Sequence, residues 1–163
     1  MTSRKPIYFS DLEQCVDALL DKVGKKVVIA GGFGRPIHIF NALFQRALAD
    51  PEIRLTIITG VSFSRPHGSS DLERRFLEPF VDRVFGNLPE LEYVQPYQRG
   101  KLPKNIEIVE VFLQAGTYLG NKHAQQNFVY SNFTHWLRDM IEQGCNVFGQ
   151  MIARREIDGE LAY

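Results

Sequence analysis

The sequence predicts an α/β fold with a mostly parallel, open sheet and helices on both faces. Apolar runs at 26–30 and 54–59 are typical of strands that are covered on both sides, as in a parallel sheet. A segment with helical spacing of apolar residues separates them, which indicates a right-handed parallel crossover. With 163 residues, 44% of them hydrophobic, the chain is large enough for one domain with its own core.

Helices are expected on either side of the first strand. The first one should begin after Ser10, because Ser10 and Glu13 form a capping-box pattern, and should end near Gly24. The second one lies between the two strands and should stop at Asp50-Pro51.

A third helix is expected after the second strand. Ser70 and Glu73 form another capping-box pattern, and Gly86 should close the helix. Pro79 should break or kink it, because proline lacks the N–H that an internal helical position donates.

The remaining elements are less regular. A long connection over 88–104, with one short strand around 91–94, is expected to precede a strand over 106–113. A loop over 118–126 should follow. The last elements expected are a helix that Asn132 caps and Gly144 ends, and a strand over 146–153. Asp158-Gly159 is a turn pair that predicts a hairpin. The sequence stops as the second arm begins, which favours a truncated chain, with a natural edge strand as the alternative. We therefore expect 1–163 to be one domain, the N-terminal half of a two-domain enzyme.

Charge and cysteine content narrow the class of protein. Lys plus Arg and Asp plus Glu both number 19, so the net charge gives no reason to expect nucleic acid or a membrane surface as a partner. The two cysteines, Cys15 and Cys145, form no CxxC pair, which fits a reducing cytoplasm. Residues 1–15 contain no apolar signal-peptide core, and no apolar run approaches the roughly 20 residues that a transmembrane helix needs.

A glycine-rich loop is the strongest functional signal. In open α/β sheets, ligands bind beyond the carboxyl ends of the strands, which here are followed by the loops 31–36, 60–64, 116–118 and 130–132. Glycines in the first loop can turn backbone N–H groups towards an anion or a polarised carbonyl. The candidate ligand-binding residues are Gly31, Gly32, Phe33, Gly34, Arg35, Pro36, Ser62, Gly116 and Asn132.

Several common kinds of site do not fit the sequence. The loop lacks the GxGxxG spacing of dinucleotide-binding proteins, and no Walker A string occurs. The four histidines are scattered without metal-ligand spacing, so no metal site is expected. No GxSxG elbow is present, and Glu107 and Glu110 should point to opposite faces of their strand. The chain thus predicts a binding loop without a catalytic residue of its own.

Three segments resemble a known family. Residues 27–36, VVIAGGFGRP, resemble the first glycine loop of the CoA-transferases, although the smaller members usually have a further glycine before the proline. The order of this loop, of IITG at 57–60 and of YSNFTHWLRDMIEQG at 130–144 is similar to the N-terminal domain of acetyl-CoA hydrolases/transferases, whose fold is related to that of sugar-phosphate isomerases.

The resemblance implies a function. In that family a glutamate of a second, C-terminal domain attacks an acyl-CoA, and the reaction passes through an acyl anhydride to a glutamyl-CoA thioester. The resemblance also implies coenzyme A as a substrate, no permanently bound cofactor, and a small carboxylate or water as the acceptor of the acyl or CoA group. Alone, the chain would carry half a site and be inactive. The alternatives are a sugar-phosphate-binding isomerase or regulator domain, and a non-catalytic interaction module. The oligomeric state stays open, with a homodimer as one option.

Overall fold

A four-stranded, all-parallel sheet forms the centre of the molecule, as predicted. The computed structural model describes residues 6–32, 34–157 and 159–162. The strand order is β3-β2-β1-β4, and the strands are β1 (Lys26–Gly31), β2 (Arg54–Thr59), β3 (Ile106–Glu110) and β4 (Val147–Gly149). Because the chain adds strands outward from β1 to one side and then returns to place β4 on the other, the strand order reverses between β1 and β4.

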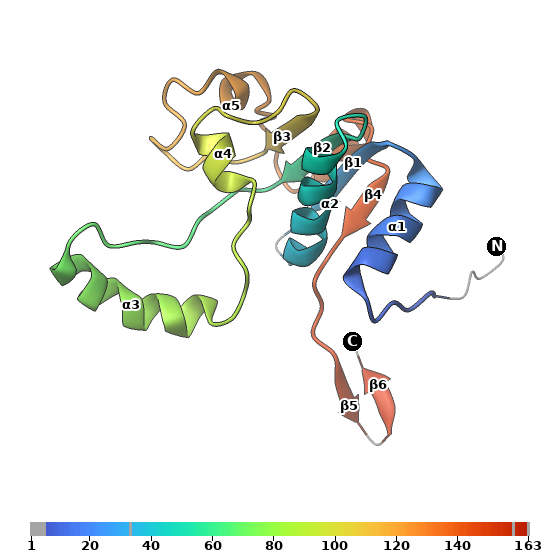
Figure 1. Ribbon diagram of the computed structural model, residues 1–163, viewed down its shortest axis with the longest axis horizontal. Coiled ribbons are helices and arrows are strands. Elements are labelled where there is room, and N and C mark those ends of the chain that lie inside the picture. The colour runs from blue at the N-terminus through green and yellow to red at the C-terminus, as the bar shows by residue number, and fades with distance from the viewer. Residues whose placement is uncertain (1–5, 33, 158, 163) are drawn as a thin grey trace.

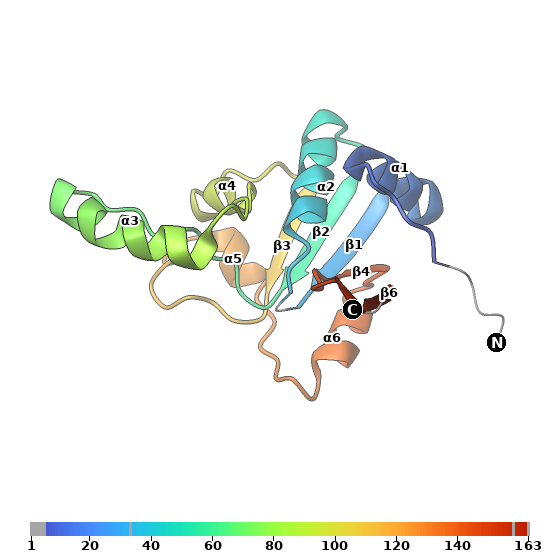
Figure 2. The ribbon, with the colours of Figure 1, turned by 90° about the horizontal axis from the view of Figure 1, so that it is seen from below.

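Helices cover both faces of this sheet (Figure 2). The better covered face carries α1 (Leu12–Val23), α2 (Ile37–Ala49) and the short α4 (Val94–Gln98), whereas α6 (Trp136–Glu142) lies on the other. The short α5 (Lys122–Gln126) packs beside β3. These placements confirm the α/β class and the covered sheet.

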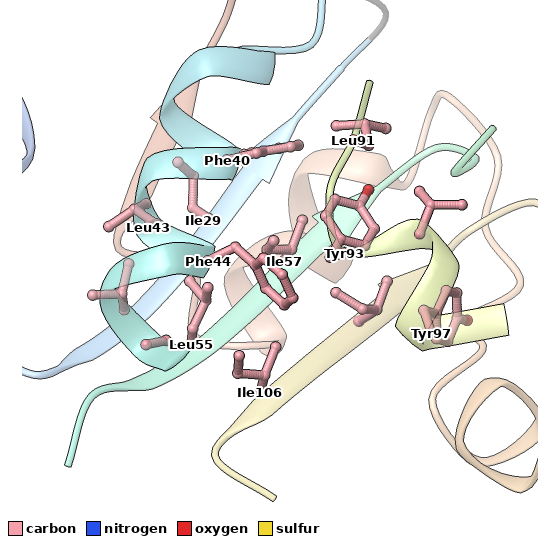
Figure 3. Packing of buried hydrophobic residues seen from close by; sticks show 14 of the residues in the cluster. Ile29, Phe40, Leu43, Phe44, Leu55, Ile57, Leu91, Tyr93, Tyr97 and Ile106 are labelled. Carbon is pink, nitrogen blue, oxygen red and sulfur yellow. The ribbon is translucent and has the colours of Figure 1, made fainter. Parts of the chain in front are cut away.

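The alternation of side chains along the strands divides the core into two unequal parts. The larger part holds Ile29, Leu55, Ile57 and Ile106 from the strands against Phe40, Leu43 and Phe44 of α2 and the tyrosines Tyr93 and Tyr97 (Figure 3). The smaller part consists of Val28, Ala30, Ile58, Val109 and Met140. The larger cluster therefore holds the sheet against α2.

Two segments extend away from the sheet (Figure 1). One is α3 (Asp71–Phe85), which has no buried residue and to which we refer as the arm. The other is the antiparallel hairpin of β5 (Arg155–Ile157) and β6 (Glu160–Ala162), which confirms the predicted hairpin, although Asp158 lies outside the described residues. In the described part of the chain, no helix has both the length and the apolar character to cross a membrane.

Helix boundaries differ from the sequence prediction at three places. The α6 helix begins at Trp136 with His135 as its N-cap residue, and not directly after Asn132, because residues 133–135 form a turn. The first helix is capped by Asp11, whose Oδ1 accepts from Gln14 N at 2.9 Å, so the Ser10 capping box is wrong: the helix starts one residue later. The α3 helix continues through Pro79, because the proline removes only one hydrogen bond from an exposed helix whose Ser70–Glu73 capping box is formed as predicted.

The second half of the chain contains less strand than predicted. The strand around 91–94 is wrong, because Tyr93 and Val94 lead into α4, and the loop at 118–126 contains α5, which Asn121 caps. The third strand ends at Glu110 because its partner β2 ends at Thr59. The fourth is shorter than 146–153 because it pairs with only three residues of β1.

Candidate functional site

A cavity of about 250 Å³ lies at the carboxyl ends of the strands. Residues that follow each of the four strands line it, together with residues at the start of α6. We refer to this cavity as the strand-end pocket, and its lining consists of Gly32, Gly34, Arg35, Gly60, Val111, Phe112, Asn132, Phe133, Trp136 and Gln150. It contains residues that follow β1 and the neighbouring β4, between which the strand order reverses, and open α/β sheets bind their ligands at such a position.

Packing alone requires two of the loop glycines. A Cβ atom on Gly31 would lie 2.7 Å from Cζ of Phe40 and 2.8 Å from Cδ of Pro36. A Cβ atom on Gly34 would lie 2.7 Å from the backbone oxygen of Met151. The backbone N–H of Met151 donates to the backbone oxygen of Gly34, so the two segments lie side by side. These two glycines let the chain turn from β1 into α2 and pass close to the residues after β4.

Two other glycines in the pocket have no such explanation. No described atom lies within 4 Å of a Cβ atom built on Gly32 or Gly60. Neither residue has the positive φ that favours glycine. Both line the strand-end pocket. Glycine at such positions is compatible with the close approach of a ligand to the backbone.

Arg35 provides a buried positive charge at the pocket wall. Its Nη2 donates to the backbone oxygen of Val61 at 2.7 Å, and its Nε to Oγ1 of Thr59 at 3.4 Å. Arg35 as a whole residue is 7% exposed. Among the described residues, no carboxylate forms an ion pair with its guanidinium. Burial lowers the pKa of Arg35, but a guanidinium keeps its charge. Glu110 acts on Arg35 only at a distance, without a direct ion pair, and a buried cation in this situation favours an anionic ligand.

A buried hydrogen-bond network supports the loop after β2. Both carboxylate oxygens of Glu110 accept from Ser62 N, at 3.1 and 2.9 Å, and Ser62 Oγ lies 2.8 Å from the hydroxyl of Tyr93. Burial raises the pKa of Glu110 to about 7, opposed by its hydrogen bonds with Ser62 and by Arg35. The network fixes Ser62 beside Val61, the residue that binds Arg35.

The structure gathers most of the predicted site residues. Gly32, Gly34, Arg35 and Asn132 line the pocket. Gly31, Pro36 and Ser62 are buried next to it and shape the loops, while Phe33 lies outside the described residues. Gly116 does not belong to the described lining, and its φ of +78° explains the glycine as a turn residue.

Sequence reasoning missed the aromatic part of the pocket. Phe112 and Phe133 lie with their ring centroids 6.2 Å apart, and Trp136 and Gln150 complete the wall. It also gave no role to Glu110, although a carboxylate at the end of an apolar strand is a signal of a buried polar network. In the segment from 132 to 136 the predicted site residue is Asn132, whose Oδ1 accepts from His135 N, whereas Phe133 and Trp136 are not predicted.

The arrangement can hold a ligand that has a negative or polarised group and an apolar part. Open backbone at Gly32 and Gly60, the guanidinium of Arg35 and three aromatic side chains surround one cavity. Ser62 is buried with its hydroxyl against Tyr93, which does not suit a nucleophile. In the described part of the chain, no group of three or more His, Cys, Asp and Glu side chains could hold a metal ion.

Comparisons with protein-family models, with curated proteins and with solved structures find no match to this chain.

Proposed function

We propose that this chain is the substrate-binding, N-terminal domain of an acyl-CoA hydrolase or CoA-transferase that acts on a short-chain acyl-CoA. The observation that carries the proposal is the strand-end pocket, in which Gly32 and Gly60 leave the backbone open beside the buried Arg35. The resemblance of residues 27–36 to a CoA-transferase glycine loop supports the same assignment.

Each part of the pocket has a role in this reaction. Backbone at Gly32 and Gly60 would lie against the thioester carbonyl, where N–H groups stabilise developing negative charge. Arg35 would attract the carboxylate that enters or leaves. The aromatic wall of Phe112, Phe133 and Trp136 would contact the acyl group or the adjoining end of the pantetheine chain, since a cavity of about 250 Å³ can hold only the thioester end of an acyl-CoA.

The covalent steps would use a glutamate from a further domain. Its carboxylate attacks the thioester carbonyl, which forms an acyl anhydride and releases the CoA thiolate. The thiolate then attacks the glutamyl carbonyl of the anhydride, so that glutamyl-CoA forms and the acyl group leaves as a carboxylate. A second carboxylate, or water, completes the turnover. In this scheme the present chain binds and orients the substrate.

A non-catalytic interaction module is the second candidate, and the arm favours it. Leu72 and Phe76 of α3 are 77% and 80% exposed, and Phe80 is 53% exposed. Apolar side chains of this size on a projecting helix are typical of surfaces that contact another chain. This candidate requires no small-molecule binding in the strand-end pocket.

The single tryptophan makes a direct test available, because Trp136 lines the pocket. Acetyl-CoA, free CoA and a sugar phosphate are titrated separately while the fluorescence of Trp136 is recorded. The proposal expects a saturable change with acetyl-CoA and CoA. A change with the sugar phosphate alone would instead favour a sugar-phosphate-binding domain, and no change with any of the three would favour the interaction module.

A matched pair of variants separates site binding from nonspecific attraction of anions. Arg35→Gln removes the charge in the pocket wall, whereas Arg54→Gln removes an exposed charge at the opposite end of β2. We expect the first to weaken acetyl-CoA binding by about tenfold or more, since hydrogen bonds to charged groups contribute about 1.5–3 kcal/mol. The second should bind as the unaltered chain does.

A further inference from the structure

A second cavity, of about 210 Å³, lies where the arm joins the body. We refer to it as the arm pocket, and its lining consists of Arg35, Ile37, Phe63, Arg65, Val84, Phe85, Leu88, Pro89, Glu90, Leu91 and Met151. Among the described lining residues, only Arg35 also belongs to the strand-end pocket. Much of its lining comes from residues 63–65 and 88–91. These residues belong to the segments that lead into and out of α3, whose course Figure 1 shows.

A series of contacts in this pocket joins two guanidinium groups through a pair of phenyl rings, in the order Arg35, Phe63, Phe85 and Arg65. Cζ of Arg35 lies 4.4 Å from the ring centroid of Phe63, and Cζ of Arg65 lies 5.7 Å from that of Phe85. The two rings meet edge to face, with centroids 6.2 Å apart. These cation–π contacts stabilise the positions of the two guanidinium groups beside the rings.

Both arginines keep unused donors. Arg65 binds the backbone oxygens of Gly86 and Leu88 through Nη2 alone, and Arg35 uses Nε and Nη2. Nη1 of Arg35, and Nε and Nη1 of Arg65, have no hydrogen-bond acceptor among the described residues. Planar donors of this kind match the geometry of a carboxylate.

The charge of the pocket also favours an anion. Glu90 is the one carboxylate in the described lining. Its Oε1 lies 3.5 Å from Nε2 of His67, a residue that does not line the pocket. Neither Arg35 nor Arg65 forms an ion pair with any described carboxylate. The described lining thus holds two cations and one carboxylate, with Glu110 acting on Arg35 from outside the lining, and this excess of positive charge in the lining favours an anionic ligand.

The walls and the size restrict the ligand further. Apart from the charged residues, the lining is aliphatic or aromatic. The volume is below the roughly 300–1,000 Å³ of pockets that hold drug-sized ligands, so the occupant must be small. We propose that the arm pocket is a binding site for a small monocarboxylate with a compact apolar body, held by Arg65 and Arg35 at the joint of the arm.

This inference does not rest on the proposed function, and calorimetric titration of the chain with phenylacetate tests it. Two further titrants, 2-phenylethanol and inorganic phosphate, separate the contributions of charge and apolar body. We expect phenylacetate to bind more tightly than either, since the alcohol lacks the charge and phosphate lacks the apolar part. Equal binding of the alcohol, tighter binding of phosphate, or no heat with phenylacetate at millimolar concentration would overturn the proposal.

Variants locate the binding. Arg65→Gln should weaken phenylacetate binding by about tenfold or more. Arg75→Gln, which changes an exposed arginine of α3 outside the pocket, should not. Val84→Trp fills the cavity from the exposed side and should abolish binding even if Arg65→Gln does not fold. Gly32→Ala, confined to the strand-end pocket, should leave phenylacetate binding unchanged. Unaltered binding in Val84→Trp would place the ligand elsewhere and refute the assignment.

Discussion

Gly31 has no room for a side chain, whereas its neighbour Gly32 and the more distant Gly60 face open space. The difference separates two regions of the site. The buried residues that adjoin the strand-end pocket, which we call its floor, are Gly31, Pro36, Ser62, Tyr93 and Glu110. The residues that line the pocket form its rim. The fold explains the floor, and Gly34 of the rim, through packing and hydrogen bonds, but it does not explain Gly32 and Gly60 of the rim, so those two positions are where function is expected to act.

The largest predicted effect concerns Glu110 in the floor. Its pKa is raised by burial from 4.5 to about 7, so the folded chain binds more protons than the unfolded chain between these values. The free energy of unfolding should therefore fall as pH rises through this window, by up to about 3 kcal/mol. Glu110→Gln removes this group, and the difference in stability between variant and unaltered chain should grow in favour of the variant from pH 5 to pH 8.

Urea denaturation at several pH values measures this difference. His123 also titrates with a pKa lowered by burial, but it contributes equally to both proteins and cancels in the comparison. Arg35 and the buried tyrosines around Glu110 keep their charge states over this range. Parallel pH profiles for the two proteins would show that Glu110 is not protonated by folding.

The second prediction concerns the packed glycines. Gly31→Ala places a methyl group against Phe40 and Pro36, and Gly149→Ala places one 2.7 Å from Cγ of Pro36. Overpacking of this kind costs about 1–3 kcal/mol, because buried neighbours must leave their preferred rotamers. Thermal or urea unfolding should show this loss for both variants. A decrease in the free energy of unfolding below about 0.5 kcal/mol would mean that the neighbours of these glycines can accommodate a methyl group, which would contradict the prediction.

A smaller effect is expected at Tyr93. Tyr93→Phe removes the hydroxyl that lies 2.8 Å from Ser62 Oγ, and the loss of such a hydrogen bond in a buried site costs about 1 kcal/mol. The matched control is Tyr97→Phe, because the buried hydroxyl of Tyr97 has no hydrogen-bond partner among the described residues. That variant should be as stable as the unaltered chain or more so. Equal losses in both variants would indicate that ring packing, and not the hydrogen bond, sets the stability.

The difference between floor and rim also explains how much the sequence could predict. Apolar runs and glycine-proline spacing predicted β1, β2, α2 and the first loop, because these signals are local. The ends of β3 and β4 could not be predicted, since they depend on where the partner strands stop. The topology brings four strand ends together, and only for this reason do Phe112, Phe133 and Gln150 line the same cavity. No local sequence pattern indicates that residues so far apart in the chain are neighbours.

The smallest change in stability is expected for substitutions at Gly32 and Gly60. The same substitutions should have the largest effect on ligand binding. Gly32→Ala and Gly60→Ala add a methyl group where no described atom lies within 4 Å and where φ is compatible with alanine. Stability should stay within about 0.5 kcal/mol or rise by up to about 1 kcal/mol, because alanine restricts the unfolded chain.

Ligand affinity should respond differently from stability in these two variants. If acetyl-CoA contacts the backbone at the rim, each methyl group stands in its path, and the Trp136 fluorescence titration should show affinity reduced by about tenfold or more. Gly100→Ala is no suitable control because its φ of +64° strains alanine, whereas Arg54→Gln leaves both backbone and pocket unchanged. Full affinity in stable Gly32→Ala and Gly60→Ala proteins would remove the reason for assigning the ligand to this rim, because open space at a glycine would then have no functional meaning here.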